Sequence, residues 1–235
     1  MARLSVVIPC KNEEKRIGHL LSDLRNQTGI LPPPKIYIAD AGSTDGTREK
    51  IDQFKEFLDI QIISGGIPSV GRNKGASESK EPYVIFIDAD MKLPQRDTLE
   101  KSLAALEAGA HLVTLDVRCP ENKKADFLYR INNQLQRISR FHQPFSTGMF
   151  MAWNREAFHR LGGFNEEIHF GEDYHLSKKV DRQKFKVVPG EIWSPDRRFR
   201  ITGTMGLLKM MASAFIQRNN PDKLKGDKGY WDHLK

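Results

Sequence analysis

The sequence predicts an α/β fold in which a mostly parallel sheet carries helices on both faces, in a single domain. Three observations lead to this prediction. Short runs rich in Val and Ile alternate with segments whose apolar residues recur at helical spacing. The runs are continuously apolar, which is typical of strands buried on both faces. The 235 residues are enough for one large domain, and no linker-like segment or internal repeat divides them.

Strands and helices alternate along the first 115 residues. We expect strands at residues 4–8, 36–39, 60–63, 83–87 and 111–115. Three helices are predicted by apolar residues three or four positions apart: Ile17, Leu20, Leu21 and Leu24; Ile51, Phe54 and Leu58, in a helix that begins at Thr47; and Leu99, Leu103 and Leu106. A fourth helix is expected near residues 71–80, after a glycine-rich turn.

The alternation is less regular after residue 120. Helices are expected over residues 126–138, 154–161 and 171–180, and strands over residues 148–153 and 185–188. A last amphipathic helix is expected over residues 204–217. We therefore assign residues 1–200 to one domain. Residues 201–235 form a C-terminal amphipathic helix and basic tail, which either belongs to that domain or associates with a membrane.

Composition excludes several classes of protein. No run approaches the ~18 apolar residues that a membrane-spanning helix needs, and residues 1–9 are typical of a first buried strand rather than of a secretory signal. The two cysteines, Cys10 and Cys119, form no CxxC pattern. A disulfide scaffold and a cysteine-rich zinc site are thereby excluded, and a reducing, cytoplasmic location is expected.

The net charge of +7 is concentrated near the C-terminus. Residues 178–235 carry 14 Lys and Arg against 6 Asp and Glu, whereas residues 1–177 carry 23 against 24. Such a tail is consistent with nucleic acid, with an anionic membrane surface or with a phosphate-bearing substrate. The alternative is a solvated C-terminus that serves solubility. No interleaving of basic and aromatic residues favours nucleic acid, so we expect no nucleic-acid partner.

Polar residues follow three of the predicted strands. The first strand leads into Pro9 to Glu13, the second ends at Asp40, and the fourth ends at Asp88-Ala89-Asp90. Ligands of open α/β sheets bind at the carboxyl ends of the strands. A helix cap is the alternative for any one aspartate, but three such ends on one edge favour a binding site.

The pair Asp88 and Asp90 is the most specific of these features. Carboxylates two residues apart at a strand end can converge on one ligand, and Mg²⁺ often bridges one or two carboxylates to substrate phosphates. Two further segments bear on the same site. Arg72 lies in a glycine-rich stretch that could meet an anion, the alternative being a turn with a surface arginine. Glu172 and Asp173 either offer a general base or compensate a helix dipole.

Taken together, the motifs resemble those of the family 2 glycosyltransferases of the GT-A fold. The matching segments are SVVIPCKNEE (5–14), DAGSTDGT (40–47), GRNKGA (71–76), FIDAD (86–90) and GGFNEEIHFGEDYHLSKKV (162–180). They occur in the family's order over about residues 4–190. The resemblance implies a Rossmann-like GT-A domain that moves a sugar from a nucleotide-diphosphate sugar to an acceptor. It also implies an inverting reaction and a need for Mg²⁺ or Mn²⁺.

The resemblance assigns roles to individual residues. Asp173 matches the catalytic base, with Glu172 beside it. Asp90 matches the metal ligand, and Asp88 the first carboxylate of the pair, near the ribose. The nucleotide-sugar positions that it implies are Pro9, Glu13, Asp40, Gly42, Arg72, Asp88, Ala89, Arg197 and Arg198. Ala41 stands where the family's common DDGS pattern has its second Asp.

The expected donor is a UDP-sugar, and the expected acceptor is a lipid-linked or polysaccharide precursor of a cell-envelope glycan. Four alternatives remain at this point. A retaining transferase of the same fold is open, because sequence does not fix stereochemistry. A nucleotidyltransferase is disfavoured by the Glu172-Asp173 motif. A non-catalytic relative is disfavoured by the retention of all four aspartates. A nucleic-acid binder lacks a supporting motif.

Overall fold

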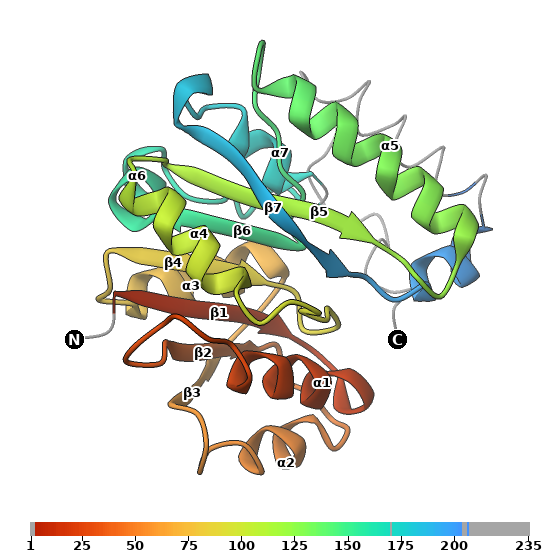
Figure 1. Ribbon diagram of the computed structural model, residues 1–235. Coiled ribbons are helices and arrows are strands. Elements are labelled where there is room, and N and C mark those ends of the chain that lie inside the picture. Colours follow the sequence, from red (N-terminus) through yellow and green to blue (C-terminus); the bar gives the residue numbers. More distant parts are fainter. Residues whose placement is uncertain (1–2, 170, 204–205, 207–235) are drawn as a thin grey trace.

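The structure, a computed structural model, describes residues 3–169, 171–203 and 206 (Figure 1). Seven strands form one sheet in the order β3-β2-β1-β4-β6-β5-β7. All neighbouring strands pair in parallel except β6, which is antiparallel to β4 and β5. The strands are β1 Leu4–Cys10, β2 Lys35–Asp40, β3 Ile60–Ser64, β4 Tyr83–Ile87, β5 Leu112–Arg118, β6 Phe150–Asn154 and β7 Phe185–Trp193. The predicted mostly parallel α/β sheet is confirmed.

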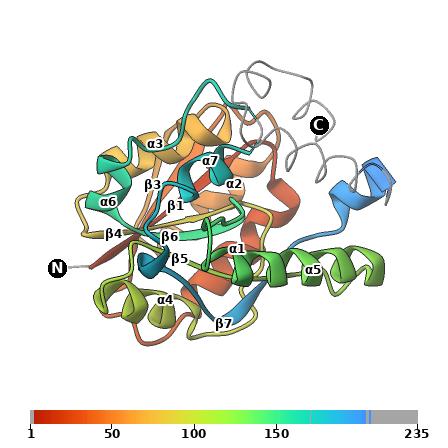
Figure 2. The same cartoon turned by 90° about the horizontal axis from the view of Figure 1, so that it is seen from above.

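Helices cover both faces of this sheet (Figures 1 and 2). They are α1 Glu14–Arg25, α2 Thr47–Asp52, α3 Pro68–Glu78, α4 Thr98–Glu107, α5 Lys123–Ser139, α6 Arg155–Arg160 and α7 Glu172–Ser177, with a 3₁₀ turn η1 Arg182–Lys184. One core holds side chains of α1, α2 and α4 against one face. A second core holds side chains of α3, α6 and α7 against the other. The alternation of inward side chains along each buried strand supplies both cores.

Strand order places a topological switch beside β1. The chain runs from β1 outward through β2 to β3, and then returns to form β4 on the other side of β1. In open α/β sheets the crevice at such a point is where ligands bind. Because β6 runs antiparallel, the residues just before it lie at the same edge as the ends of β1 and β4.

Several helices differ from their predicted bounds, among them α5, which begins at Lys123 rather than at residue 126. Helix α2 ends at Asp52, because the following amides bond three residues back rather than four, as from Phe54 to Ile51. Helix α7 ends at Ser177 for the same reason, with Val180 bonded to Ser177. Helix α3 begins at Pro68, before the expected start near residue 71, and Gly65 and Gly66 precede it.

The predicted helix over residues 204–217 lies outside the described residues. Within the described part of the chain, no helix is long and apolar enough to cross a lipid bilayer. Cys10 and Cys119 are both free and buried.

Candidate active site at the carboxyl edge of the sheet

The polar residues predicted at three strand ends do lie at one edge of the sheet. Asp40 closes β2, and Asp88 follows β4 directly. Register pairs Cys10 with Asp40, so the ends of β1 and β2 are level. Gly148, just before β6, comes to the same place: its neighbour Met149 accepts a hydrogen bond from the Asp88 amide at 3.3 Å.

Arg72 joins two of the predicted motifs. Its guanidinium donates to Asp88 Oδ1 at 2.6 Å, to Glu172 Oε1 at 2.8 Å and to the Gly148 carbonyl at 3.2 Å. The side chain is 2% exposed. The surface-arginine alternative is therefore wrong. We call Arg72, Asp88, Gly148, Glu172 and Asp173 the Arg72 cluster.

Asp173 enters this cluster through Gly148. The Gly148 amide donates to Asp173 Oδ2 at 2.5 Å, while the carbonyl of the same residue accepts from Arg72. Asp173 Oδ1 also accepts from the Tyr174 amide at 2.7 Å. Backbone amides thus fix both oxygens of the predicted base. A side chain at position 148 would conflict with this arrangement, because a Cβ there would lie 2.9 Å from Arg72 Nη2.

Two glycines bring Arg72 to this position. Gly71 and Gly75 lie four residues apart on the face of α3 that packs on the sheet. A Cβ on Gly75 would lie 2.3 Å from Val7, and one on Gly71 would lie 3.0 Å from Ala39. The helix can therefore approach β1 and β2 closely, and Arg72 reaches the carboxyl edge of the sheet.

The two adjacent acids of α7 share one positive charge. Burial, and next the charge of Asp173, raises the pKa of Glu172 to about 7, although Arg72 opposes the rise. Burial also raises the pKa of Asp173, against the hydrogen bonds from Tyr174 and Gly148 and the charge of Arg72. A carboxylate with a raised pKa is a stronger base near neutral pH. This is the electrostatic setting that proton abstraction requires.

A second arginine bridges the other predicted carboxylates. Arg197 Nη2 donates to Glu13 Oε1 at 2.8 Å and to Asp90 Oδ2 at 3.2 Å. Burial, and next the charge of Asp90, raises the pKa of Glu13. Burial, and next the charge of Asp88, raises the pKa of Asp90, and Arg197 opposes both shifts. We call Arg197, Glu13 and Asp90 the Arg197 cluster.

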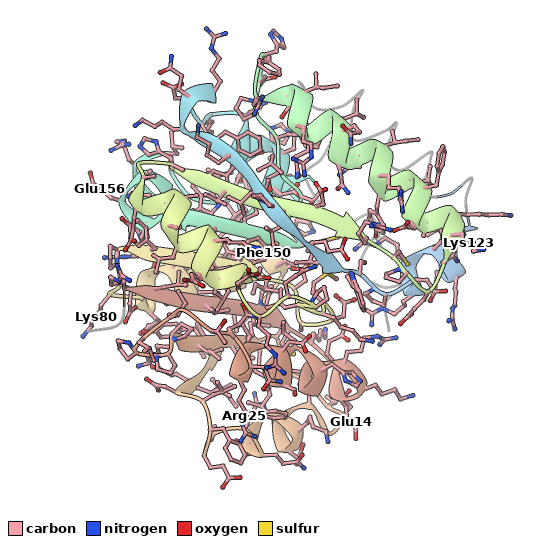
Figure 3. The ribbon with its side chains drawn as sticks, in the orientation of Figure 1. Glu14, Arg25, Lys80, Lys123, Phe150 and Glu156 are labelled. Atoms are coloured by element: carbon pink, nitrogen blue, oxygen red, sulfur yellow. The ribbon has the colours of Figure 1, made fainter. Side chains whose placement is uncertain are left out.

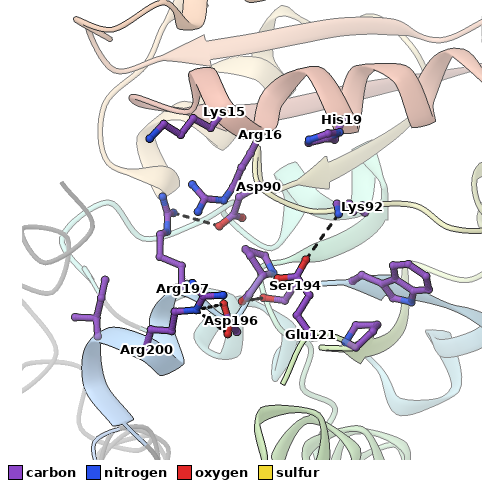
Figure 4. Close-up of a pocket in the computed structure, with 14 residues that line it drawn as sticks. Lys15, Arg16, His19, Asp90, Lys92, Glu121, Ser194, Asp196, Arg197 and Arg200 are labelled. Atoms are coloured by element: carbon purple, nitrogen blue, oxygen red, sulfur yellow. Dashed lines mark hydrogen bonds and ion pairs between the residues drawn. The ribbon is translucent and has the colours of Figure 1, made fainter. Parts of the chain in front are cut away.

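The Arg197 cluster borders a cavity of about 510 Å³ between the start of α1 and the segment that follows β7 (Figure 4). Asp90 and Arg197 both line it. Most of its other charged side chains are cationic: Lys15, Arg16, Lys92 and Arg200, against Glu121 and Asp196. An anionic ligand fits this balance of charge.

Asp40 is held by its own loop. Its Oδ1 accepts from the Ser43 amide and hydroxyl at 3.0 and 2.6 Å, and its Oδ2 accepts from Arg48 Nε at 2.6 Å. Burial favours a raised pKa, but these hydrogen bonds outweigh it and hold the pKa of Asp40 below its usual range. Asp40 therefore closes a turn and does not cap a helix, since the residue before α2 is Gly46.

The remaining predicted residues lie around these groups. Pro9 and Gly42 flank the β1 and β2 ends, with Gly42 exposed at a positive φ of 76°. Ala89 is buried between the two aspartates. Arg198 follows Arg197, and its charge bears on Asp90. Gly148 and Arg48 were not among the predicted residues, because a lone glycine and a helix-surface arginine carry no motif.

Asp88 and Asp90 form the donor set that a divalent metal would use. Arg72 occupies one oxygen of Asp88 and Arg197 one oxygen of Asp90, while the second oxygen of each accepts no hydrogen bond from the described residues. Two carboxylates completed by substrate phosphates suit Mg²⁺. No group of three or more His, Cys, Asp or Glu side chains gathers as a metal site in the part of the chain that the structure describes.

Comparison with known proteins gives a family. The sequence model described as glycosyl transferase family 2 matches residues 5–162. The chain is 29% identical over 210 residues to the succinoglycan biosynthesis protein ExoA of Rhizobium meliloti, covering 82% of this chain and 60% of ExoA. It is 26% identical over 111 residues to the poly(ribitol-phosphate) beta-N-acetylglucosaminyltransferase TarS of Staphylococcus aureus, covering 46% of this chain and 19% of TarS. The matches thus span three fifths or less of these relatives.

Solved structures agree on the fold. A mannosyltransferase from Pyrobaculum calidifontis, in complex with GDP-Man and Mn²⁺, matches with a TM-score of 0.70 at 23% identity, covering 92% of this chain and 64% of that one. TarS residues 1–349 in complex with UDP-GlcNAc match with a TM-score of 0.67 at 17% identity, covering 82% of this chain and 58% of that one. These likenesses confirm the predicted GT-A fold.

Proposed function

Because the chain belongs to glycosyl transferase family 2, we propose that it is a metal-dependent, inverting transferase of a sugar from a nucleotide-diphosphate sugar. The proposed donor is a UDP-sugar, and the proposed acceptor is a hydroxyl of a lipid-linked or polysaccharide precursor. Solved relatives hold UDP-GlcNAc in one case and GDP-Man with Mn²⁺ in another. ExoA is named for succinoglycan biosynthesis, which supports a glycan acceptor.

One observation carries the proposal. Gly148 holds Asp173 with its amide and Arg72 with its carbonyl, and Arg72 in turn holds Asp88. A candidate base and a candidate donor-site carboxylate are thereby fixed at one edge of the sheet, beside the switch point. A transfer reaction needs both groups within reach of one substrate pair.

The base has a defined task. Asp173 takes the proton of the acceptor hydroxyl while that oxygen forms a bond to the anomeric carbon of the sugar. The bond from the anomeric carbon to the diphosphate oxygen breaks on the opposite face, and the nucleoside diphosphate leaves with the electron pair. The backbone amides of Gly148 and Tyr174 orient the carboxylate, and its raised pKa strengthens it as a base.

Asp88 and Asp90 would hold the divalent cation, Mg²⁺ or Mn²⁺. When bound, such an ion neutralises charge on the diphosphate leaving group. Arg72 keeps Asp88 in place. The cationic wall of the cavity, with Arg197, faces the same region and suits an anionic diphosphate.

A thermal-shift panel with UDP, GDP, dTDP and CDP and their sugars, each with and without Mn²⁺, tests the donor site. A ligand at about 100 times its Kd adds about 2.7 kcal/mol of stability. We expect the largest metal-dependent shift with one uridine nucleotide. No shift with any nucleotide, in folded protein, would contradict the proposal.

Two substitutions separate binding from chemistry. Asp173→Asn removes the base, so transfer should fall by roughly 10²- to 10⁴-fold while the donor-induced shift persists. Asp90→Ala should lose the metal-dependent part of the shift. Asp52→Asn, at an exposed ion pair with Lys55, is the matched control and should change neither. Full transfer by Asp173→Asn would remove the base assignment.

A further inference from the structure

Helix α5 presents apolar side chains to solvent along its outer face. Phe127 is 62% exposed, Ile131 42%, Leu135 49% and Ile138 61%, and Phe141, just beyond the helix, is 65% exposed. Their spacing of three or four residues places them on one side of the helix. We call these five residues the α5 stripe. Only three other large apolar side chains among the described residues are comparably exposed: Leu31, Phe57 and Ile201.

The inner face of α5 explains why these residues point outward. Strand β5 pairs with β6 only at Leu112 and Val113, so its later backbone groups on that side lack a strand partner. Asn133 supplies one by bonding both the amide and the carbonyl of Val117, at 3.0 and 2.9 Å, and Gln136 donates to the Leu115 carbonyl at 3.2 Å. The buried side of α5 therefore includes Asn133 and Gln136 beside Ala125 and Leu128, and the apolar stripe is left on the outside.

The exposed charge around the stripe is positive. Lys123, Lys124, Arg130 and Arg140 are all exposed. Asp126 is the one acid between residues 123 and 140, and its side chain is 13% exposed because Arg118 and Arg130 bind it. An apolar stripe bordered by cations is the composition of a helix that lies in a membrane interface.

We propose that the α5 stripe docks this protein on an anionic lipid bilayer. The phenylalanine and isoleucine side chains enter the boundary between headgroups and acyl chains, and the flanking lysines and arginines meet the anionic headgroups. Two other occupants fit the charges less well. A second copy would bring cation against cation. The chain's own residues 204–235 carry 6 Lys and Arg against 3 Asp, again the same sign.

The location of α5 relates this surface to the site. The helix begins at the carboxyl edge of the sheet, where Figure 3 shows Lys123. Pro120 and Glu121, just before the helix, line the cavity beside Asp90. The bilayer contact would therefore lie next to the opening of the candidate active site. The inference does not depend on which reaction that site performs.

Sedimentation of the full-length protein with lipid vesicles tests the docking surface. The vesicles are phosphatidylcholine alone, or phosphatidylcholine with phosphatidylglycerol, at low and high salt. We expect binding to the anionic vesicles that weakens with salt, and a loss of at least about tenfold in the Phe127→Glu/Ile138→Glu variant. The control, Leu31→Glu/Phe57→Glu, changes two other exposed apolar residues, 86% and 45% exposed, and should bind as the wild type does.

A second pair of variants removes the effect of added negative charge. Phe127→Gln/Ile138→Gln should also lose binding, whereas Leu31→Gln/Phe57→Gln should not. All four positions are exposed, so thermal unfolding should remain near that of the wild type.

Three results would overturn the proposal. The first is that the wild type does not sediment with anionic vesicles. The second is that the stripe variants bind as well as their controls, which would place the lipid contact elsewhere in the chain. The third is that analytical ultracentrifugation shows a lipid-free dimer that the stripe variants abolish, which would make a second copy the occupant.

Discussion

Two arginines at the carboxyl edge each bridge two carboxylates, but the two arginine side chains differ in their exposure to solvent. Arg72 projects from a helix packed tightly on the sheet and is 2% exposed. Arg197 follows the last strand, lines an open cavity and is 21% exposed. Arg72 also donates to a backbone carbonyl, whereas Arg197 donates to the carboxylates of Glu13 and Asp90.

The difference separates a fixed part of the site from an exchangeable part. Ions in the interior cannot lose a partner without a large desolvation cost, so the Arg72 cluster holds one geometry. Arg197 is 21% exposed at the cavity wall and can exchange partners with a ligand there, although Glu13 and Asp90 are themselves only 9% and 16% exposed. The Arg197 cluster, which borders the cavity, is therefore more accessible to a ligand than the Arg72 cluster.

Removing Arg72 gives the largest effect that this comparison predicts. In Arg72→Met, the buried Glu172 and the partly exposed Asp88 lose the cation between them, and the free energy of unfolding should fall by about 3–5 kcal/mol. Urea denaturation measures the loss. Arg72→Lys keeps the charge but cannot span both carboxylates, so it should recover only part of it.

The outcome that contradicts the comparison is simple to recognise. If Arg72→Met costs no more stability than the loss of Arg197, the two clusters contribute equally to the free energy of unfolding. The burial of Arg72 then adds nothing to stability.

The pH dependence of stability tests the charge balance inside the Arg72 cluster. The folded-state pKa of Glu172 is about 7, above its ordinary value of 4.5. The folded protein therefore binds more protons than the unfolded chain between these values, and the contribution of Glu172 to the free energy of unfolding falls as pH rises from 4.5 to 7. Glu172→Gln should lack this contribution.

Comparing the wild type with Glu172→Gln isolates the contribution of Glu172. Burial lowers the pKa of His175 to about 4, which gives a slope of the opposite sign over part of the same range in both proteins. Urea denaturation of wild type and Glu172→Gln from pH 4.5 to 7 measures the difference. Parallel curves would mean that Arg72 keeps Glu172 ionised throughout.

Sequence was sufficient for the fold because its strands are buried on both faces. A continuously apolar run such as residues 83–87 has one stable place in an α/β domain, and β4 is found there. Helix ends were less predictable. Phe54 and Leu58 continue the helical spacing of α2, but the chain follows tighter turns that still bring Leu58 into the core. Periodicity reports which residues are inside, not which hydrogen-bond ladder places them there.

The candidate site was predictable where a residue carries its own chemistry. The carboxylates at strand ends were identified in this way, while their binding roles stay predictions. Gly148 was missed because its importance lies in what its neighbours do with its backbone. The burial of Arg72 did have a signal: Gly71 and Gly75 are four apart around it, which predicts a helix pressed against the sheet. Residues 126–138 were likewise predicted to be helical, but not which side of α5 faces the core.

The smallest effect on stability, and the most specific to one cluster, is expected from Arg197→Gln. Because the Arg197 side chain is 21% exposed, its loss should lower the free energy of unfolding by less than the loss of Arg72, which is 2% exposed. Binding of Mn²⁺ alone, measured by titration calorimetry, should nevertheless become several-fold tighter, because Asp90 no longer has a competing cation. Lys92→Gln, which removes another cation of the same cavity paired with Glu121 at 3.8 Å, is the control and should change Mn²⁺ affinity less. If Arg197→Gln weakens Mn²⁺ binding instead, Arg197 positions Asp90 for the metal rather than competing with it, and the Arg197 cluster is as fixed as the Arg72 cluster.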